Sequence, residues 1–222
     1  FTSVGKTAMA VQKMCNLLLM DNAPSIVVIS TEMTEEQLVS RILANFTGIH
    51  SYRILSGNYR NGEEEFVVAY KDLLKKKPLR IYDDVYAISD IETVFRKADL
   101  QGGVDVGFID YVQNCRVPDA SSAYQEGSAM AKRLQKMAKD VRCTLLCLSQ
   151  VSNSVDLGGR RIIKNKGAGE WAAVADVGIF LKRSREDGEK LLYKVDKNRH
   201  GQTLDQEFRY MADFTRLESA DY

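Results

Sequence analysis

The stretch Val4-Gly5-Lys6-Thr7, at the start of this 222-residue chain, matches the second half of a phosphate-binding loop. Glycine lets backbone N–H groups turn toward phosphate oxygens, the lysine ammonium neutralises their charge, and the threonine hydroxyl ligates magnesium. Residues 8–20 follow with helical periodicity, and the N-terminus of such a helix attracts an anion. Taken alone, the tripeptide Gly5-Lys6-Thr7 also fits an ordinary helix N-terminus. The assignment therefore depends on the rest of the chain.

Length and composition favour one globular domain over residues 1–222. With 45% hydrophobic residues the chain can bury a sizeable core, and a net charge of +1 gives no global attraction to nucleic acid. No apolar run approaches the length of a membrane span, so we expect a soluble, cytoplasmic protein without a membrane partner. The four cysteines lack a Cys-x-x-Cys spacing and are expected to be reduced core thiols.

Apolar runs alternate with stretches of helical period, which predicts an α/β fold with a mainly parallel sheet flanked by helices. Strands are predicted at 25–30, 79–82, 104–109, 144–149 and 176–181, and helices at 35–46, 63–76, 88–101 and 123–141. Two of these helices are predicted to begin with capping boxes, Thr34 with Gln37 and Ser89 with Glu92. Runs at 190–196, 204–210 and 214–219 predict antiparallel strands that close the sheet edge.

A phosphate-binding loop of this kind normally follows a buried strand. Phe1 stands only four residues before Gly5, so no such strand can precede the loop in this sequence. We expect the intact protein to carry an upstream segment that supplies the strand. A native polypeptide mass near 25.0 kDa would contradict this expectation.

Three polar residues stand at predicted strand ends, where open α/β sheets gather their ligand-binding groups. Asp110 follows the strand 104–109 and is suited to hold magnesium, although a turn aspartate fits equally well. Glu32 follows the first strand and suits a general base toward water, or simply a first-turn acid of the next helix. Gln150 closes the strand 144–149 and suits a γ-phosphate sensor, or is a polar strand end.

A basic turn, Lys197-Asn198-Arg199-His200-Gly201, lies between two predicted C-terminal strands. The guanidinium of Arg199 has the geometry to stabilise the spread charge of a phosphoryl-transfer transition state. Taken alone, the turn also fits a solvated hairpin tip. The order and spacing of the five features together favour the phosphoryl-transfer interpretation.

These features resemble the C-terminal RecA-like motor domain of DnaB-type hexameric replicative DNA helicases, and the match extends in order over nearly the whole chain. RecA-like recombinases share the loop and the sheet but usually lack the combination of Asp-Tyr-x-Gln with Lys-x-Arg-x-Gly. Thr2, Cys115 and Trp171 depart from the family pattern and favour a divergent phage or plasmid relative. The stretches that carry the resemblance are Gly5-Lys6-Thr7, Ser30-Thr31-Glu32-Met33, Ile109-Asp110-Tyr111-Val112-Gln113, Leu148-Ser149-Gln150, Lys166-Gly167-Ala168-Gly169, Ala175-Asp176 and Lys197-Asn198-Arg199-His200-Gly201.

The resemblance implies ATP and Mg²⁺ as cofactors of a P-loop NTPase. It implies that Thr7 and Asp110 hold the metal, that Glu32 activates water, and that Arg199 acts as a finger in the adjacent subunit's site. The remaining implied catalytic residues are Lys197, beside the finger, and Gln150, which couples the γ-phosphate to the DNA loops. The residues implied to bind the nucleotide are Ser3, Val4, Gly5, Lys6, Thr7, Ala8 and Asp110.

The resemblance also implies a homo-hexamer that moves 5′–3′ on single-stranded DNA, with a primase and a helicase loader as further partners. Two loops, 114–123 and 151–169, would contact DNA, and their cations also fit ordinary solvated surface. Residues implied to bind DNA are Arg116, Arg160, Arg161, Lys164, Lys166, Gly167 and Gly169.

Two other classes of protein share the phosphate-binding features. One is a RecA-like recombinase or clock-type ATPase, which would exchange strands or keep time without unwinding DNA. The other is a nucleotide-dependent loader or regulatory module, which would bind ATP stoichiometrically without multiple turnovers.

Overall fold

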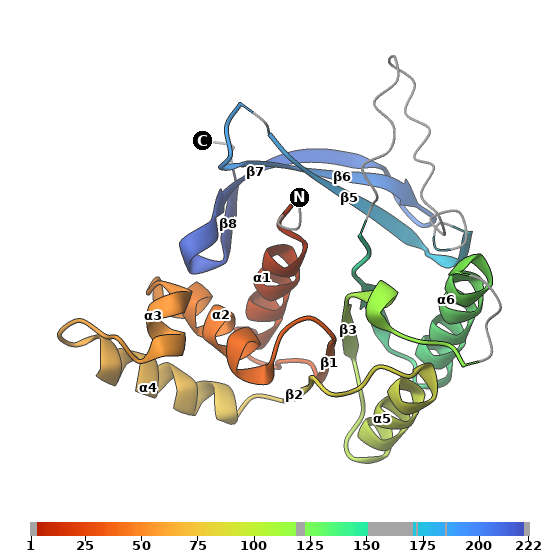
Figure 1. The fold of residues 1–222 in the computed structure, drawn as a ribbon, viewed down its shortest axis with the longest axis horizontal. Helices are drawn as coiled ribbons and strands as arrows, with labels where there is room; N and C mark the ends of the chain where they lie inside the picture. The colour runs from red at the N-terminus through yellow and green to blue at the C-terminus, as the bar shows by residue number, and fades with distance from the viewer. Residues whose placement is uncertain (1–3, 119–122, 151–170, 172, 185, 220–222) are drawn as a thin grey trace.

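The computed structural model describes residues 4–118, 123–150, 171, 173–184 and 186–219. In these residues helices cover both faces of a parallel sheet, and an antiparallel sheet packs against α1, which confirms the predicted α/β class (Figure 1). The helices are α1 (Lys6–Leu18), α2 (Glu35–Thr47), α3 (Ser51–Ser56), α4 (Glu63–Lys75), α5 (Ile88–Leu100) and α6 (Ala123–Asp140), with 3-10 turns η1 (Val112–Asn114) and η2 (Ala212–Phe214). The strands are β1 (Ile26–Ser30), β2 (Leu79–Tyr82), β3 (Val106–Asp110), β4 (Thr144–Cys147), β5 (Val177–Arg183), β6 (Lys190–Asn198), β7 (Leu204–Met211) and β8 (Arg216–Ser219).

The parallel sheet has the strand order β2-β1-β3-β4. All five residues of β1 are buried, because helices cover the sheet on both sides. Ile26 and Val28 belong to the core with α1, α2 and α4, whereas Val27 and Ile29 belong to the core with α5 and α6. A strand buried on both faces needs a continuous apolar run, and this run made β1 predictable from sequence.

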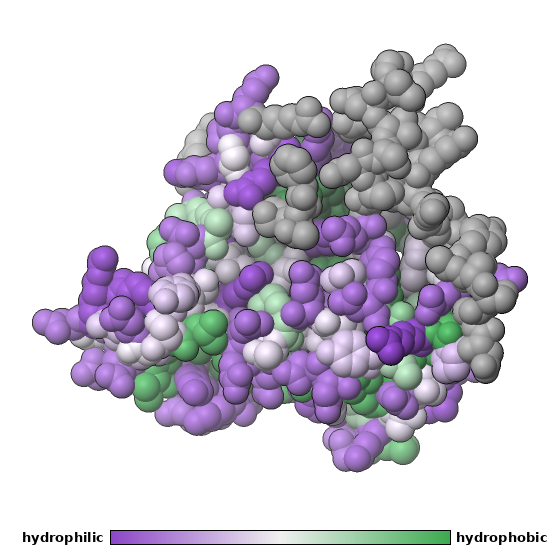
Figure 2. Space-filling view, in the orientation of Figure 1, coloured by the Kyte–Doolittle hydropathy of each residue, from purple (hydrophilic) through white to green (hydrophobic). Residues whose placement is uncertain are grey.

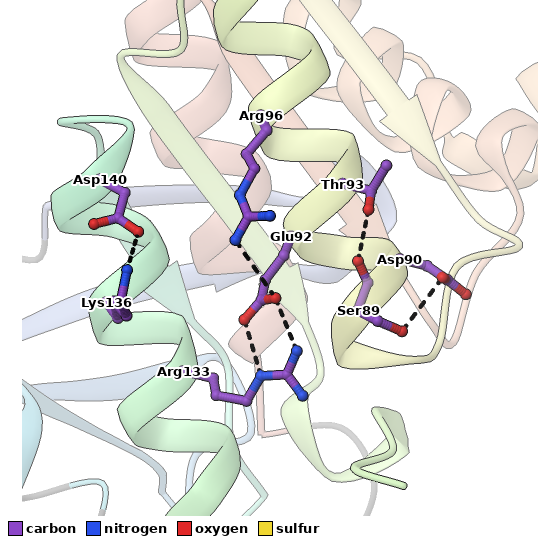
Figure 3. Close-up of polar contacts among 8 residues, drawn as sticks. All are labelled: Ser89, Asp90, Glu92, Thr93, Arg96, Arg133, Lys136 and Asp140. Atoms are coloured by element: carbon purple, nitrogen blue, oxygen red, sulfur yellow. Dashed lines mark hydrogen bonds and ion pairs between the residues drawn. The ribbon is translucent and has the colours of Figure 1, made fainter.

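Helices α5 and α6 are joined by a bidentate ion pair between Glu92 and Arg133 (Figure 3). Arg133 of α6 donates from Nε and Nη2 to the two carboxylate oxygens of Glu92, at 2.9 and 2.8 Å. The Glu92 side chain is only 15% exposed, and Arg96 approaches it from the same helix at 3.8 Å. The hydrogen bond from Arg133 lowers the pKa of Glu92 against the opposing effect of burial. The pair therefore stabilises the packing of these two helices mainly when Glu92 is ionised.

The antiparallel sheet has the order β5-β6-β7-β8 and packs on α1 through an apolar cluster of Met9, Leu191 and Leu217. Leu191, at the start of β6, is fully buried. Lys13 of α1 also lies over the ring of Tyr193 at 5.6 Å. The first turn of α1 and the first residues of β6 are thus in direct contact.

A partly buried hydrogen-bond network attaches β8 to α1 and α2. The Oε1 atom of Gln12 accepts hydrogen bonds from Asn45 Nδ2 and from the backbone N–H of Leu217, both at 3.0 Å. Asn45 Nδ2 also donates to the Thr215 carbonyl at 2.8 Å, and Arg216 donates to the Asn45 carbonyl at 2.5 Å. These bonds satisfy polar groups that would otherwise be buried without partners.

Of the two predicted capping boxes, the structure confirms one. Thr34 accepts from the N–H of Gln37, and the Gln37 side chain accepts from the N–H of Thr34. The box at Ser89 was wrong, because the N-cap residue of α5 is Ala87, two positions before Ser89, and its side chain makes no capping hydrogen bond. Glu92 does not turn back to the helix end, because Arg133 engages it.

Three other predictions from sequence need correction. The strand predicted at 176–181 is β5, which pairs antiparallel with β6 and does not join the parallel sheet. Together with the three strands that follow, it forms a separate sheet in the described residues, so those strands do not close the edge of the parallel one. The helix α3 was not predicted, and the strand predicted to reach 149 ends at Cys147. No strand lies before α1 in the described residues.

On the face shown in Figure 2, the described surface is mainly hydrophilic, with apolar side chains in separate small groups. One such group lies over α3 and α4, where Tyr52, Leu55, Phe66 and Leu73 are exposed. None of the described helices has the length and apolar content needed to cross a membrane.

The four cysteines are all free thiols, as the sequence predicted. Burial raises the pKa of Cys147 and of Cys15 to about 12, and that of Cys115 to about 11. These thiols are therefore protonated at neutral pH and contribute to the core as small apolar groups.

Candidate functional site

The phosphate-binding loop is described from Val4 onward. Gly5 has φ 102° and precedes α1, and its carbonyl accepts the first helical hydrogen bond from Met9 at 2.9 Å. A side chain at this φ would be strained, so the position requires glycine. The first turn of α1 contains no acidic residue, and no side chain caps it among the described residues. Its N–H groups are therefore available to an anion.

The other residues predicted to bind the nucleotide begin α1. Lys6 is half-buried, and Ala8 is fully buried, so Ala8 can contact a ligand only through its backbone. Ser3 lies outside the described residues.

Thr7 and Asp110 meet at the end of β3. The Thr7 hydroxyl donates to Asp110 Oδ2 at 2.7 Å, and Asp110 is only 6% exposed. The second carboxylate oxygen, Oδ1, is buried and has no hydrogen-bond partner in the described part of the chain. Burial raises the pKa of Asp110 and Glu32 adds to this, while the Thr7 hydrogen bond and the charges of Lys6 and Arg41 oppose it.

This chemistry fits a divalent cation. A hydroxyl and a carboxylate oxygen with a free lone pair are hard oxygen ligands of the kind that Mg²⁺ prefers. A cation near Oδ1 would satisfy the unpartnered atom and offset the cost of burying the carboxylate. The residues that the sequence predicted to hold the metal are therefore brought together.

Glu32 lies two residues after the end of β1 and is exposed at the same edge of the sheet. Its peptide neighbour Thr31 is buried and bonded to the end of β3: the Thr31 N–H donates to the Asp110 carbonyl at 2.7 Å, and the Tyr111 N–H donates to the Thr31 hydroxyl at 3.0 Å. Because Ser30 of β1 pairs with Asp110 of β3, Glu32 lies at the same end of the sheet as the Thr7–Asp110 pair, and its negative charge contributes to the raised pKa of Asp110.

Arg41 is a cationic residue whose charge acts on Asp110 and which was not singled out from the sequence. It lies half-buried on α2, nine residues after Glu32, and its charge lowers the pKa of Asp110. No short motif marks it. The sequence offered no stronger signal than an arginine between Ser40 and Ile42 in the helix after Glu32.

Gln150 is exposed at the end of the segment that follows β4. Its backbone is held by the Gln113 side chain: Gln113 Nε2 donates to the Gln150 carbonyl at 3.1 Å, and the Gln150 N–H donates to Gln113 Oε1 at 3.2 Å. Gln113 comes from η1, immediately after the Asp110 strand end. Gln150 is thus linked through Gln113 to the segment that follows Asp110.

Arg199 and Lys197 are not brought to the phosphate-binding loop. Arg199 follows β6 and donates to Asp176 Oδ1 at 2.9 Å and to the Ala173 carbonyl at 2.8 Å. The neighbouring Val174 carbonyl accepts from Gln135 of α6, so this end of the β5–β6 hairpin lies beside α6 (Figure 1). Lys197 pairs with Gly178 of β5. The basic turn therefore lies at the opposite end of β6 from Leu191, which packs near the loop.

The residues predicted to bind DNA are described only in part. Arg116 is exposed, and its backbone pairs with Tyr86 and Ile88 at the start of α5. The remaining residues lie outside the described residues: Arg160, Arg161, Lys164, Lys166, Gly167 and Gly169.

Comparison with known proteins identifies the family. Residues 1–219 match the model of the DnaB-like helicase C terminal domain. A "Probable plasmid replicative DNA helicase" from Chlamydia trachomatis serovar L2 is 29% identical over 90% of this chain and 45% of its own length. The "Replicative DNA helicase DnaB" of Treponema pallidum is 26% identical over 97% of this chain and 49% of its own length. The chain thus spans about half the length of these curated relatives.

Solved structures agree on the fold. A solved structure of an isolated ATPase domain superposes with a TM-score of 0.88 at 20% identity, covering 99% of this chain and 82% of that one. Another, "The Structure Of A DnaB-Like Replicative Helicase And Its Interactions With Primase", has a TM-score of 0.86 at 20% identity, covering 98% of this chain and 55% of that one. With a family match over nearly its whole length, the chain belongs to the DnaB-like helicase C-terminal domain family.

Proposed function

We propose that this chain is the ATP-hydrolysing motor of a hexameric replicative DNA helicase. The observation that carries the proposal is the Thr7–Asp110 hydrogen bond at 2.7 Å, with Asp110 Oδ1 buried and unpartnered beside it in the described residues. This is the arrangement that a magnesium-bound triphosphate requires at the start of a helix.

Each residue of the site has a distinct role in this proposal. The N–H groups after Gly5 and the ammonium of Lys6 bind the phosphates, and Thr7 and Asp110 hold Mg²⁺. When bound, the metal neutralises the charge that develops on the β- and γ-phosphate oxygens. Glu32, exposed beside Asp110, orients the attacking water and accepts its proton.

Arg199 is proposed to act on a neighbouring subunit. Leu191, eight residues before it, packs against Gly5: a Cβ added to Gly5 would meet Leu191 Cδ2 at 3.5 Å. An extended strand rises about 3.3 Å per residue, so Arg199 lies about 26 Å along β6 from its own phosphate-binding loop. An arginine side chain does not span this distance. We therefore propose a composite site, in which Arg199 and Lys197 complete the site of the adjacent protomer.

The remaining partners follow from the family. We propose a homo-hexamer that translocates 5′–3′ on single-stranded DNA, with contacts from Arg116 and from the cations of 151–169. A primase is proposed as a partner because a structural relative is described with one. A helicase loader and a cytoplasmic location complete the proposal. A plasmid or phage origin is proposed because a relative is named a plasmid helicase.

The test is the ATPase rate against protein concentration, with and without single-stranded DNA. A composite site predicts that the specific activity rises steeply as protomers assemble and that DNA stimulates it over many turnovers. Lys6→Ala should abolish turnover, and chelation of Mg²⁺ should do the same. Stoichiometric nucleotide binding without turnover would instead indicate a loader or regulatory module. Strand exchange without unwinding would indicate a recombinase.

A further inference from the structure

The segment Tyr111–Asn114 lies between the ends of two neighbouring strands of the parallel sheet. It follows β3, which has β1 on one side and β4 on the other. The regular strand pairing ends at Asp110 toward β1 and at Ile109 toward β4. Beyond these points, side chains of the segment Tyr111–Asn114 form hydrogen bonds with the backbone that follows β1 and β4.

Asn114 continues the pairing toward β1. Its Nδ2 donates to the Thr31 carbonyl at 3.2 Å. This carbonyl belongs to the peptide group whose N–H is that of Glu32, so the bond fixes the orientation of the peptide that carries Glu32. Thr31 is buried, and its hydroxyl also contacts the carbonyls of Asp110 and Tyr111 at 3.1 and 3.2 Å.

Gln113 continues the pairing toward β4. Its amide makes a reciprocal pair with the backbone of Gln150, as one peptide group does with another in a sheet. Its Nε2 also donates to Ser149 Oγ at 2.6 Å. The last backbone bond before it runs from Val112 N–H to the Leu148 carbonyl at 3.0 Å.

Two adjacent amides thus point to opposite neighbours. We propose that Gln113 and Asn114 are positioning residues, which fix Gln150 and Glu32 respectively relative to Asp110. The inference rests on the proposed function, in which Glu32 activates water and Gln150 couples the γ-phosphate to DNA. Gln113 and Asn114 lie in the same 3-10 turn, η1, shortly after Asp110. A shift of Asp110 would therefore move Glu32 and Gln150 together.

The expected effects are kinetic. A misplacement of about 1 Å at a catalytic group can lower a rate roughly 100-fold. Asn114→Ala should lower kcat about 10- to 100-fold with and without DNA. Gln113→Ala should leave the basal rate within about 3-fold of wild type and remove most of the DNA stimulation. Nucleotide affinity should change little in either variant, because neither side chain contacts the phosphate-binding loop in the described residues.

The experiment uses the natural full-length polypeptide, assembled on single-stranded DNA. We would measure kcat, KM and the affinity for a fluorescent ATP analogue, with thermal denaturation as a folding check. Asn114→Asp keeps the shape but removes the donor to Thr31, so it should be as impaired as Asn114→Ala. Asn58→Ala and Gln101→Ala, which alter exposed amides elsewhere, are matched controls and should behave as wild type.

Double variants separate positioning from general structural damage. In single-turnover measurements, Asn114→Ala should cause no further loss in a Glu32→Gln background, and Gln113→Ala should cause none in a Gln150→Ala background. Additive losses would overturn the proposal, as would variants that match the controls. If the wild-type protein itself shows no DNA-stimulated turnover, the proposed function fails. If the wild-type protein shows DNA-stimulated turnover but the Gln113 and Asn114 variants behave as wild type, the positioning roles are wrong and the proposed function still stands.

Discussion

Two inactive variants should restore activity when they are mixed. Lys6→Ala removes the phosphate-binding ammonium, and Arg199→Ala removes the finger, so each homogeneous assembly should lose at least about 10³-fold in turnover. β6 keeps Arg199 about 26 Å from the phosphate-binding loop of its own subunit. Each proposed site therefore takes Lys6 from one subunit and Arg199 from the next, so a site can be intact although each subunit carries one of the two substitutions. In a ring assembled from equal amounts, about one quarter of the interfaces pair an intact Lys6 with an intact Arg199. The steady-state ATPase rate should recover to about that fraction of wild type.

The assay requires proof that mixed rings form. The two variants carry different affinity tags, are dissociated and reassembled together with single-stranded DNA, and are purified over both tags in turn. As a control, Lys6→Ala is mixed with the Lys6→Ala/Arg199→Ala double variant, which cannot form an intact interface. Doubly tagged rings that hydrolyse no faster than this control would refute the composite site.

Three further predictions concern other parts of the described structure. Leu191→Ala should cost about 2–5 kcal/mol, because Leu191 is fully buried, and should lower the Tm by roughly 5–20 °C; a shift below about 2 °C would contradict its role in the core. Glu92 has a lowered pKa in the folded protein, so its ion pair with Arg133 stabilises the fold above the ordinary glutamate pKa of 4.5 and is lost as the pH falls through the lowered value. Glu92→Gln should therefore reduce the slope of Tm against pH on the acid side. An unchanged slope would show that the Glu92–Arg133 pair does not contribute to the pH dependence of stability. Gly5→Ala should weaken ATP binding about 5- to 30-fold in a nucleotide titration, because the added side chain strains the loop backbone by about 1–2 kcal/mol. The control is Gly48→Ala, which introduces similar strain at φ 69° after α2. It should lower stability and leave ATP binding unchanged.

The parts of the site that sequence predicted are those set by one strand and its end. Asp110 and Glu32 each follow an apolar run, and parallel strands bring their carboxyl ends to one edge. Gly5 to Thr7 form a contiguous motif whose geometry is local. For the same reason the boundaries of β1 and α2 were predicted to within one residue.

The parts that sequence did not predict depend on contacts between distant segments. The charge of Arg41 reaches Asp110 because α2 packs on α1, and Gln113 meets Gln150 across 37 residues. The failed capping box has the same origin, since Arg133 is 41 residues from Glu92. β5 was assigned to the wrong sheet because an apolar strand pattern does not name its partner.

The hydrogen bonds of the half-buried Gln12 amide have a consequence for how the polypeptide is made. Gln12 lies in the helix that follows the phosphate-binding loop, yet it accepts a hydrogen bond from Leu217, 205 residues later. During translation the hydrogen bond between Gln12 and Leu217 can form only after Leu217 has left the ribosome. The nucleotide-binding helix is therefore synthesised long before the segment that completes its native environment.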